Sequence, residues 1–166
     1  MSAVDSIVCR QADLNDLAGL ARLFDAYRQF YRQQPDISGA EAFLRTNLER
    51  QRAVIYLALE QKPQPDGSPS FLGFAQLYPT LSSVSMREVW TLNDLFVAAE
   101  ARGRGIGGRL LSASAEHGRA TGAAFIQLST GTDNGTAQRL YEKSGYIRDT
   151  EFLTYSLKLE NQPCVE

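Results

Sequence analysis

Residues 90–111 read WTLNDLFVAAEARGRGIGGRLL and decide the fold of the chain. The first part, Trp90–Ala98, is rich in β-branched, aromatic and leucine residues and predicts a strand. A glycine-rich turn follows over 99–108, and apolar residues then recur at helical spacing from Ile106. A strand that passes through glycines into a helix start leaves unpaired N–H groups at the positive end of the helix dipole. The stretch therefore predicts a phosphate site. Positive charge around the turn comes from Arg102, Arg104 and Arg109.

Two phosphate-binding patterns fit the glycine turn. Gly103, Gly105 and Gly108 match G-x-G-x-x-G, the fingerprint of dinucleotide-binding oxidoreductases. That pattern requires a carboxylate about 20 residues further on to hold a ribose hydroxyl, and residues 125–132 contain none. The second pattern is Arg/Gln-x-x-Gly-x-Gly, which RGRGIG at 102–107 satisfies. A glycine turn without any ligand is the third alternative.

Length and composition are those of one ordinary domain spanning residues 1–166. The net charge of −2 argues against nucleic-acid binding, which needs a basic face. No apolar run approaches the ~20 residues that span a bilayer, and the N-terminus lacks the basic start and apolar core of a secretory signal. Cys9 and Cys164 have neither metal-ligand nor redox spacing, so we expect reduced thiols in a cytoplasmic protein without membrane contact.

The single histidine, His117, falls on the apolar stripe of the helix predicted after the glycine turn. Packing in the core is therefore a better interpretation of this residue than catalysis. A single histidine also provides few of the side chains that a zinc site or a Ser-His-Asp triad needs, so we predict no metal.

Strands and helices are predicted along the whole chain. Strands are expected at Ser6–Arg10, Ala53–Glu60, Phe71–Tyr78, Met86–Ala98, Ala124–Thr130, Gly145–Arg148 and Phe152–Leu159. Helices are expected at 14–34, at Ser38–Arg50 with Ser38 as the cap, from the glycine turn to Gly122, and at Thr132–Lys143. Hairpins make the first strands antiparallel, and the crossover helix after the glycine turn favours a parallel pair. The predicted fold class is α/β (α+β), with a mixed, mostly antiparallel sheet flanked by helices.

A second motif, NGTAQRLYEKSGY at 134–146, follows the glycine turn. It resembles the pattern Asn-x-x-Ala-x-x-Leu-Tyr-Glu-Lys-x-Gly-Phe of the GNAT superfamily of N-acetyltransferases, with Tyr146 in place of the usual Phe. In that family the Arg/Gln-x-x-Gly-x-Gly loop binds the pyrophosphate of acetyl-CoA. Two motifs at the family's spacing are more specific than either alone, and the resemblance covers Phe71–Leu159 well. It implies the GNAT fold, with the parallel strand pair around the acetyl-CoA site.

The resemblance implies acetyl-CoA as the cofactor and CoA as a product. In the family the acetyl-pantetheine arm lies along the end of the central strand, where a backbone N–H can stabilise the oxyanion. Asn134 matches the side chain that hydrogen-bonds this arm, and Tyr141 matches the general acid that protonates the leaving thiolate. A packed helix aromatic is the alternative interpretation of Tyr141. The cofactor-binding residues implied in this way are Leu95, Phe96, Val97, Arg102, Gly103, Arg104, Gly105, Ile106, Gly107, Gly108, Asn134, Thr136, Ala137 and Tyr141.

The acceptor amine is less well defined. The strand is similar to that of the diamine, polyamine and histone-type acetyltransferase branch, which reads Leu-Glu-Asp-Phe-Phe-Val and uses its Glu as a base or substrate ligand. Asn93 stands at that position here and cannot usefully accept a proton. Asp94 is a candidate catalytic base, although strand alternation turns it to the opposite face unless a bulge intervenes. Glu88, a tyrosine or a water chain are the alternatives. The expected substrate-binding residues are Tyr27, Arg28, Tyr31 and Asn93.

The sequence thus predicts an acetyl-CoA-dependent N-acetyltransferase. Its acceptor is a primary amine, which belongs to a small molecule such as a polyamine or to a protein lysine or N-terminus. A non-catalytic acyl-CoA-binding module of the same fold is the alternative, and the presence of Tyr141 beside an intact glycine turn disfavours it. The sequence does not decide the oligomeric state, and a homodimer is possible.

Overall fold

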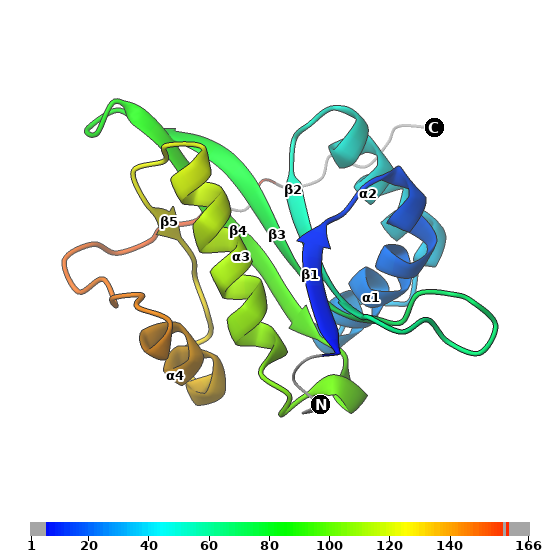
Figure 1. Ribbon diagram of the computed structural model, residues 1–166. Coiled ribbons are helices and arrows are strands. Elements are labelled where there is room, and N and C mark those ends of the chain that lie inside the picture. Colours follow the sequence, from blue (N-terminus) through cyan, green and yellow to red (C-terminus); the bar gives the residue numbers. More distant parts are fainter. Residues whose placement is uncertain (1–5, 158, 160–166) are drawn as a thin grey trace.

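The computed structural model describes residues 6–157 and 159, and a curled five-stranded sheet organises them (Figure 1). The strands lie in chain order as β1 (Ile7–Gln11), β2 (Val54–Glu60), β3 (Phe71–Ser82), β4 (Arg87–Val97) and β5 (Ile126–Gln127). Neighbours from β1 to β4 are antiparallel, whereas β5 runs parallel to β4. The predicted fold class is confirmed, including its parallel pair.

Helices cover both faces of the sheet (Figure 1). They are α1 (Leu17–Phe30), α2 (Ile37–Glu49), α3 (Ile106–Ala120) and α4 (Gly135–Lys143), with short 3-10 helices at Leu14–Asp16 (η1) and Ala99–Ala101 (η2). Phe24 of α1 packs on Phe74 of β3 with ring centroids 5.9 Å apart. The preceding Gly73 faces the other way, because successive strand residues point to opposite faces, and a Cβ there would lie 3.4 Å from Leu110 of α3. Hence α1 and its partner α2 cover one face and α3 covers the other.

A β-bulge interrupts the pairing of β3 with β4. Gln76 is opposite Asp94, whereas the next residue, Leu77, is opposite Leu92, so Asn93 is an extra residue on β4. Without the extra residue Leu92 and Asp94 would share a face, and with it they lie on opposite faces. Asp94 consequently lies beside Gln76 on the face that α1 covers, which simple alternation along the strand does not predict.

Several boundaries differ from the expectations drawn from sequence. The first helix ends at Phe30 instead of continuing to position 34. The cap of α2 is Asp36, whose Oδ1 accepts from the Gly39 N–H at 2.8 Å, so Ser38 lies inside the first turn. β5 has two residues where seven were expected, and α4 begins only at Gly135.

The two closing strands predicted after α4 are not formed in the part of the chain that the structure describes. Residues 145–157 are irregular, and no neighbouring strand lies beside them. Because a strand depends on a neighbour for its backbone hydrogen bonds, an apolar alternating pattern alone does not produce one.

His117 is half-buried and packs against Trp90, with its ring centroid 4.7 Å from that of Trp90. Burial lowers the pKa of His117, and its Nδ1 lies 3.2 Å from the Tyr56 hydroxyl. Over the described residues, no helix combines the length and the apolar character needed to cross a bilayer.

Candidate active site

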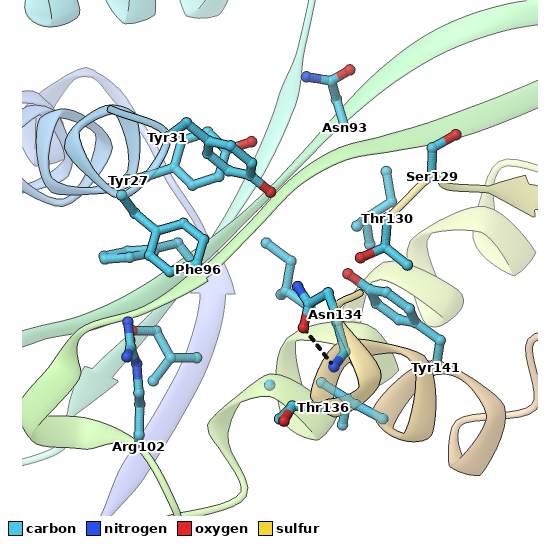
Figure 2. A pocket seen from close by; sticks show the side chains of 17 residues that line it. Tyr27, Tyr31, Asn93, Phe96, Arg102, Ser129, Thr130, Asn134, Thr136 and Tyr141 are labelled. Carbon is cyan, nitrogen blue, oxygen red and sulfur yellow. Dashed lines mark hydrogen bonds between the residues drawn. The ribbon is translucent and has the colours of Figure 1, made fainter. Parts of the chain in front are cut away.

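A cavity of about 350 Å³ lies where α1, the end of β4, the glycine turn and α4 meet (Figure 2). Twelve of the residues singled out in the sequence line it: Tyr27, Tyr31, Asn93, Leu95, Phe96, Val97, Arg102, Gly107, Asn134, Thr136, Ala137 and Tyr141. The structure therefore brings together positions that are more than a hundred residues apart in the chain.

The cavity exists because β4 and β5 separate. β5 pairs with β4 only at Trp90 and Thr91. Beyond these residues β4 keeps its β3 neighbour and has no strand on its other edge, among the described residues. Backbone groups of Leu95–Val97 on that edge therefore face the cavity. The Val97 carbonyl accepts from Arg102 Nε at 3.2 Å, and the other groups on that edge are available to a ligand.

The glycine turn ends in an uncapped helix start. Gly103 and Gly105 have positive φ angles of 77° and 74°, and Gly105 is the N-cap of α3 without any side-chain cap. No acidic residue occupies the first turn, so the first N–H groups of α3 have neither a side-chain acceptor nor a carboxylate near them. Gly107 lines the cavity, where a Cβ would lie 2.9 Å from a methyl carbon of Leu140.

Some of the residues expected to bind the cofactor lie around the turn without lining the cavity. Arg104 forms a salt bridge of 2.6 Å with Glu60 and so ties the turn to β2. Ile106 is buried in the core. Gly103, Gly105 and Gly108 have no protein atom within 4 Å of an added Cβ, so open space surrounds them.

The second wall of the cavity is α4. Its N-cap, Asn134, accepts from the Ala137 N–H at 3.1 Å (dashed line in Figure 2). The Asn134 oxygen is thus occupied, and its amide nitrogen is left to donate. Tyr141 points its hydroxyl into the cavity, facing the tyrosines of α1 (Figure 2). Burial, and secondarily Tyr31, raises the pKa of Tyr141, so the phenol keeps its proton at neutral pH.

The third wall carries a buried carboxylate behind an aromatic layer. Asp94 is 5% exposed and accepts from Gln76 Nε2 at 2.9 Å and from Asn93 Nδ2 at 3.0 Å. The Tyr27 hydroxyl also hydrogen-bonds Asp94. Burial raises the pKa of Asp94, and the three hydrogen bonds oppose that rise. Asp94 does not itself line the cavity and reaches it through Tyr27 and Asn93.

Tyr27 and Tyr78 flank this carboxylate and are kept protonated. Burial and the charge of Asp94 raise the pKa of Tyr27, and burial raises the pKa of Tyr78 to about 12. Tyr78 hydrogen-bonds Gln76, whose Oε1 is buried with no partner in the described structure. These groups form one polar cluster beneath the aromatic wall.

Arg28 lies away from the cavity. Its guanidinium bonds Asp25 Oδ1 and the Gln34 carbonyl, each at 3.2 Å, and closes the turn between α1 and α2. Sequence reasoning missed five lining residues: Phe30, Leu92, Ser129, Thr130 and Leu140. Ser129 and Thr130 follow the carboxyl end of a parallel strand, a position where ligands commonly bind, and this signal was available.

Comparison with known proteins gives a consistent result. The profile of the Acetyltransferase (GNAT) family matches residues 20–146. The chain is 48% identical over 150 residues to an uncharacterized N-acetyltransferase YhfO of Bacillus subtilis, covering 90% of this chain and 96% of that protein. A solved structure of a probable acetyltransferase is 39% identical, with a TM-score of 0.85 over 93% of this chain and 99% of that one. An aminoglycoside acetyltransferase, meta-AAC0020 from a soil metagenome, has a TM-score of 0.76 at 16% identity, which shows the shared fold alone.

The chain therefore belongs to the GNAT family and is an acetyltransferase. The interpretation of the glycine turn as that of a dinucleotide-binding oxidoreductase is therefore wrong. Within the described residues no group of three His, Cys, Asp or Glu side chains is placed to hold a metal ion.

Proposed function

We propose that this chain transfers acetyl from acetyl-CoA to a primary monoamine with an apolar or aromatic body. The observation that carries the proposal is the single cavity in which the glycine turn, the Tyr141 hydroxyl and the aromatic wall of α1 meet.

The residues around the cavity fit acetyl-CoA. Free N–H groups at the start of α3 and open space around its glycines suit a pyrophosphate, and Arg102 adds positive charge. The edge of β4 at Leu95–Val97, which β5 does not cover, suits an amide-containing arm, and Asn134 offers a further donor. When bound, acetyl-CoA supplies the acetyl group as an activated thioester.

The roles of the chain's own residues follow from their protonation. Tyr141 holds its proton and donates it to the leaving sulfur when the carbon–sulfur bond breaks. The amine loses a proton as its new carbon–nitrogen bond forms, and Asp94 accepts a proton through Tyr27. Tyr27 takes the proton of the amine while its own hydroxyl proton moves to the carboxylate that it already contacts. Backbone N–H groups of 95–97 stabilise the developing negative oxygen.

The lining of the cavity favours a monoamine over a polyamine. Arg102 is the one charged residue among the described residues that line the cavity. A polyamine brings further ammonium groups, and burying them without carboxylate partners is costly. Tyr27, Phe30 and Tyr31 offer aromatic faces, which attract one ammonium group and pack against an apolar body.

An acceptor panel tests this function by measuring the release of free CoA thiol. We expect 2-phenylethylamine and hexylamine to have a higher kcat/KM than spermidine or a lysine peptide. Calorimetry with CoA, acetyl-CoA and NAD provides the binding control, and we expect only the first two to bind. Spermidine as the best acceptor would contradict the acceptor class, and transfer to none of the amines by a CoA-binding protein would contradict the reaction.

A further inference from the structure

A second cavity, of about 710 Å³, lies beside α1 and next to the candidate active site. Its walls come from α1, the loop between β2 and β3, the end of β4 and η2. The ring of Phe71 forms part of one wall and packs directly on the backbone of α1, because a Cβ at Gly19 would overlap this ring. Small-molecule sites have volumes of roughly 300–1,000 Å³, so the second cavity is large enough for a ligand.

Aromatic and aliphatic side chains make up much of the lining of the second cavity. Leu23 and Phe30 contribute from α1, and Phe71 and Phe96 contribute from the sheet. Phe30 is 59% exposed, so much of its ring is left uncovered by the protein. A ligand with an apolar body would remove these surfaces and its own from water, and this burial supplies affinity.

The charges around the second cavity favour an anion. Arg22 and Arg102 line it together with Glu100, which is the one carboxylate among the described lining residues. Neither arginine takes part in a salt bridge with the residues that the structure describes. Their guanidinium groups are therefore available to a ligand carboxylate, whose planar shape suits two parallel hydrogen bonds with such a group.

Three residues, Phe30, Phe96 and Arg102, line both cavities and form the partition between them. In Figure 2, Phe96 and Arg102 lie on the side of the active-site cavity opposite Tyr141. The Arg102 side chain donates one hydrogen bond, from Nε to the Val97 carbonyl, and its terminal nitrogens have no partner among the described residues. An anion in the second cavity would therefore draw the charge of Arg102 away from the glycine turn.

We propose that the second cavity is an effector site for an organic carboxylate with an apolar body, and that its occupation weakens acetyl-CoA binding through Arg102. A carboxylate paired with Arg102 from this side competes with the pyrophosphate for the same positive charge. Coupling between two ligands is reciprocal, so CoA weakens the binding of the carboxylate by the same factor. The site does not depend on the acceptor amine, whereas the coupling rests on the acetyl-CoA site proposed above.

Calorimetry with 3-phenylpropanoate tests the site, and 3-phenylpropanamide serves as the uncharged probe of the same shape. We expect the carboxylate to bind, and both the change to the amide and the Arg22→Gln substitution to weaken binding roughly fivefold, as for loss of one exposed ion pair. No binding of 3-phenylpropanoate at millimolar concentration would overturn the site, and equal binding of the two probes would overturn the preference for an anion.

Filling the second cavity locates the binding. Ala26→Phe places a ring in this cavity and should abolish the binding of 3-phenylpropanoate, with CoA binding and circular dichroism unchanged. Ala42→Phe is the matched control, because Ala42 is an exposed residue of α2 that lines neither cavity, and this variant should bind 3-phenylpropanoate normally. Unchanged binding of the carboxylate to a folded Ala26→Phe protein would reject the second cavity as its site.

Titration of CoA with and without saturating 3-phenylpropanoate tests the coupling. We expect the carboxylate to raise the Kd of CoA roughly fivefold in the wild type and to leave it unchanged in Ala26→Phe, whose substituted residue does not line the active-site cavity. An equal rise in both proteins would show direct competition in the active site, and no rise in the wild type would show independent cavities, so either result rejects the coupling. A protein that binds 3-phenylpropanoate in an Ala26-dependent way and does not bind CoA would confirm the site and reject the proposed cofactor.

Discussion

Replacing Asp94 by asparagine should abolish most of the activity while leaving the fold intact. The change removes the negative charge and the proton-accepting oxygen that Tyr27 contacts. We expect kcat/KM to fall by about 10²–10⁴-fold, the range for loss of a general base, which is about 2.7–5.4 kcal/mol in transition-state stabilisation.

The surrounding cluster can accommodate the amide. Gln76 now donates to Asp94, and its buried Oε1 has no partner in the described structure. The asparagine oxygen can take the place of the Asp94 oxygen that accepts from Gln76 Nε2, so this hydrogen bond is kept. The new side-chain nitrogen then faces Asn93 Nδ2, and the exposed Asn93 amide can turn to water. One hydrogen bond is then exchanged for a hydrogen bond to water, and we expect the free energy of unfolding to change by no more than about 1 kcal/mol at neutral pH.

The pH dependence of stability has a definite sign. Burial raises the folded-state pKa of Asp94 above its unfolded value, so the protonated folded form is favoured. The stability that Asp94 contributes is present at low pH and is lost as the pH rises through its folded-state pKa. The free energy of unfolding of the variant should therefore rise relative to that of the wild type from about pH 4, where an unfolded aspartate titrates, up to the raised folded-state pKa of Asp94.

Urea unfolding at several pH values and kcat/KM with the best amine measure the two effects separately. Tyr27→Phe serves as the companion variant, because it keeps the ring and removes the hydroxyl that joins Asp94 to the cavity. A folded Asp94→Asn protein with wild-type kcat/KM would refute the proton path, and so would a Tyr27→Phe protein with wild-type activity.

Three further variants address the cofactor, the acid and the acceptor. Gly105→Val should abolish CoA binding, as measured by calorimetry, because the valine side chain enters the open space beside the first N–H groups of α3. The control is Gly67→Val, at a similar φ in an exposed loop, which should bind CoA normally. Tyr141→Phe should lower kcat by about 10²–10⁴-fold with little change in acetyl-CoA affinity. Its control is Tyr146→Phe, whose hydroxyl has no partner in the described structure and whose loss should be nearly neutral. Asn93→Glu should raise kcat/KM for spermidine, and unchanged spermidine activity would contradict this expectation. The kcat/KM of the wild type should climb through pH 8–9, because alkyl amines have a pKa of about 10.4. A flat pH profile would contradict this second expectation.

The sequence was sufficient for the parts of the fold that depend on local pattern. The strand, glycine turn and helix of Trp90–Leu111 form where the pattern predicts them. The asparagine that opens the second motif caps α4, as a residue of that type should. These features are encoded within a few residues of one another, so periodicity and cap preference are enough to find them.

Features that depend on partners distant in sequence were not predictable in the same way. Asp36 caps α2 in place of Ser38 because the helix begins earlier than expected, at Ile37. A hydrogen bond of 2.8 Å from the Asp36 N–H to Asp25 Oδ1 holds the backbone at this start. The strand pattern at Phe152–Leu159 is present in the sequence, yet a strand needs a neighbouring strand for its backbone hydrogen bonds, and periodicity alone does not provide one.

The bulge at Asn93 links the two properties that make the site suited to acetyl transfer. It turns Asp94 onto the face of Tyr27, where a proton acceptor can act behind the aromatic wall. It also falls shortly after Thr91, the last residue of β4 that pairs with β5. Because a bulge increases the twist of its strand, β4 turns away from β5 from this point onward, and the gap between them is the cavity. Without the bulge the glycine turn would still offer a phosphate site, but Asp94 would leave the side of Tyr27 and the proposed proton path would be lost.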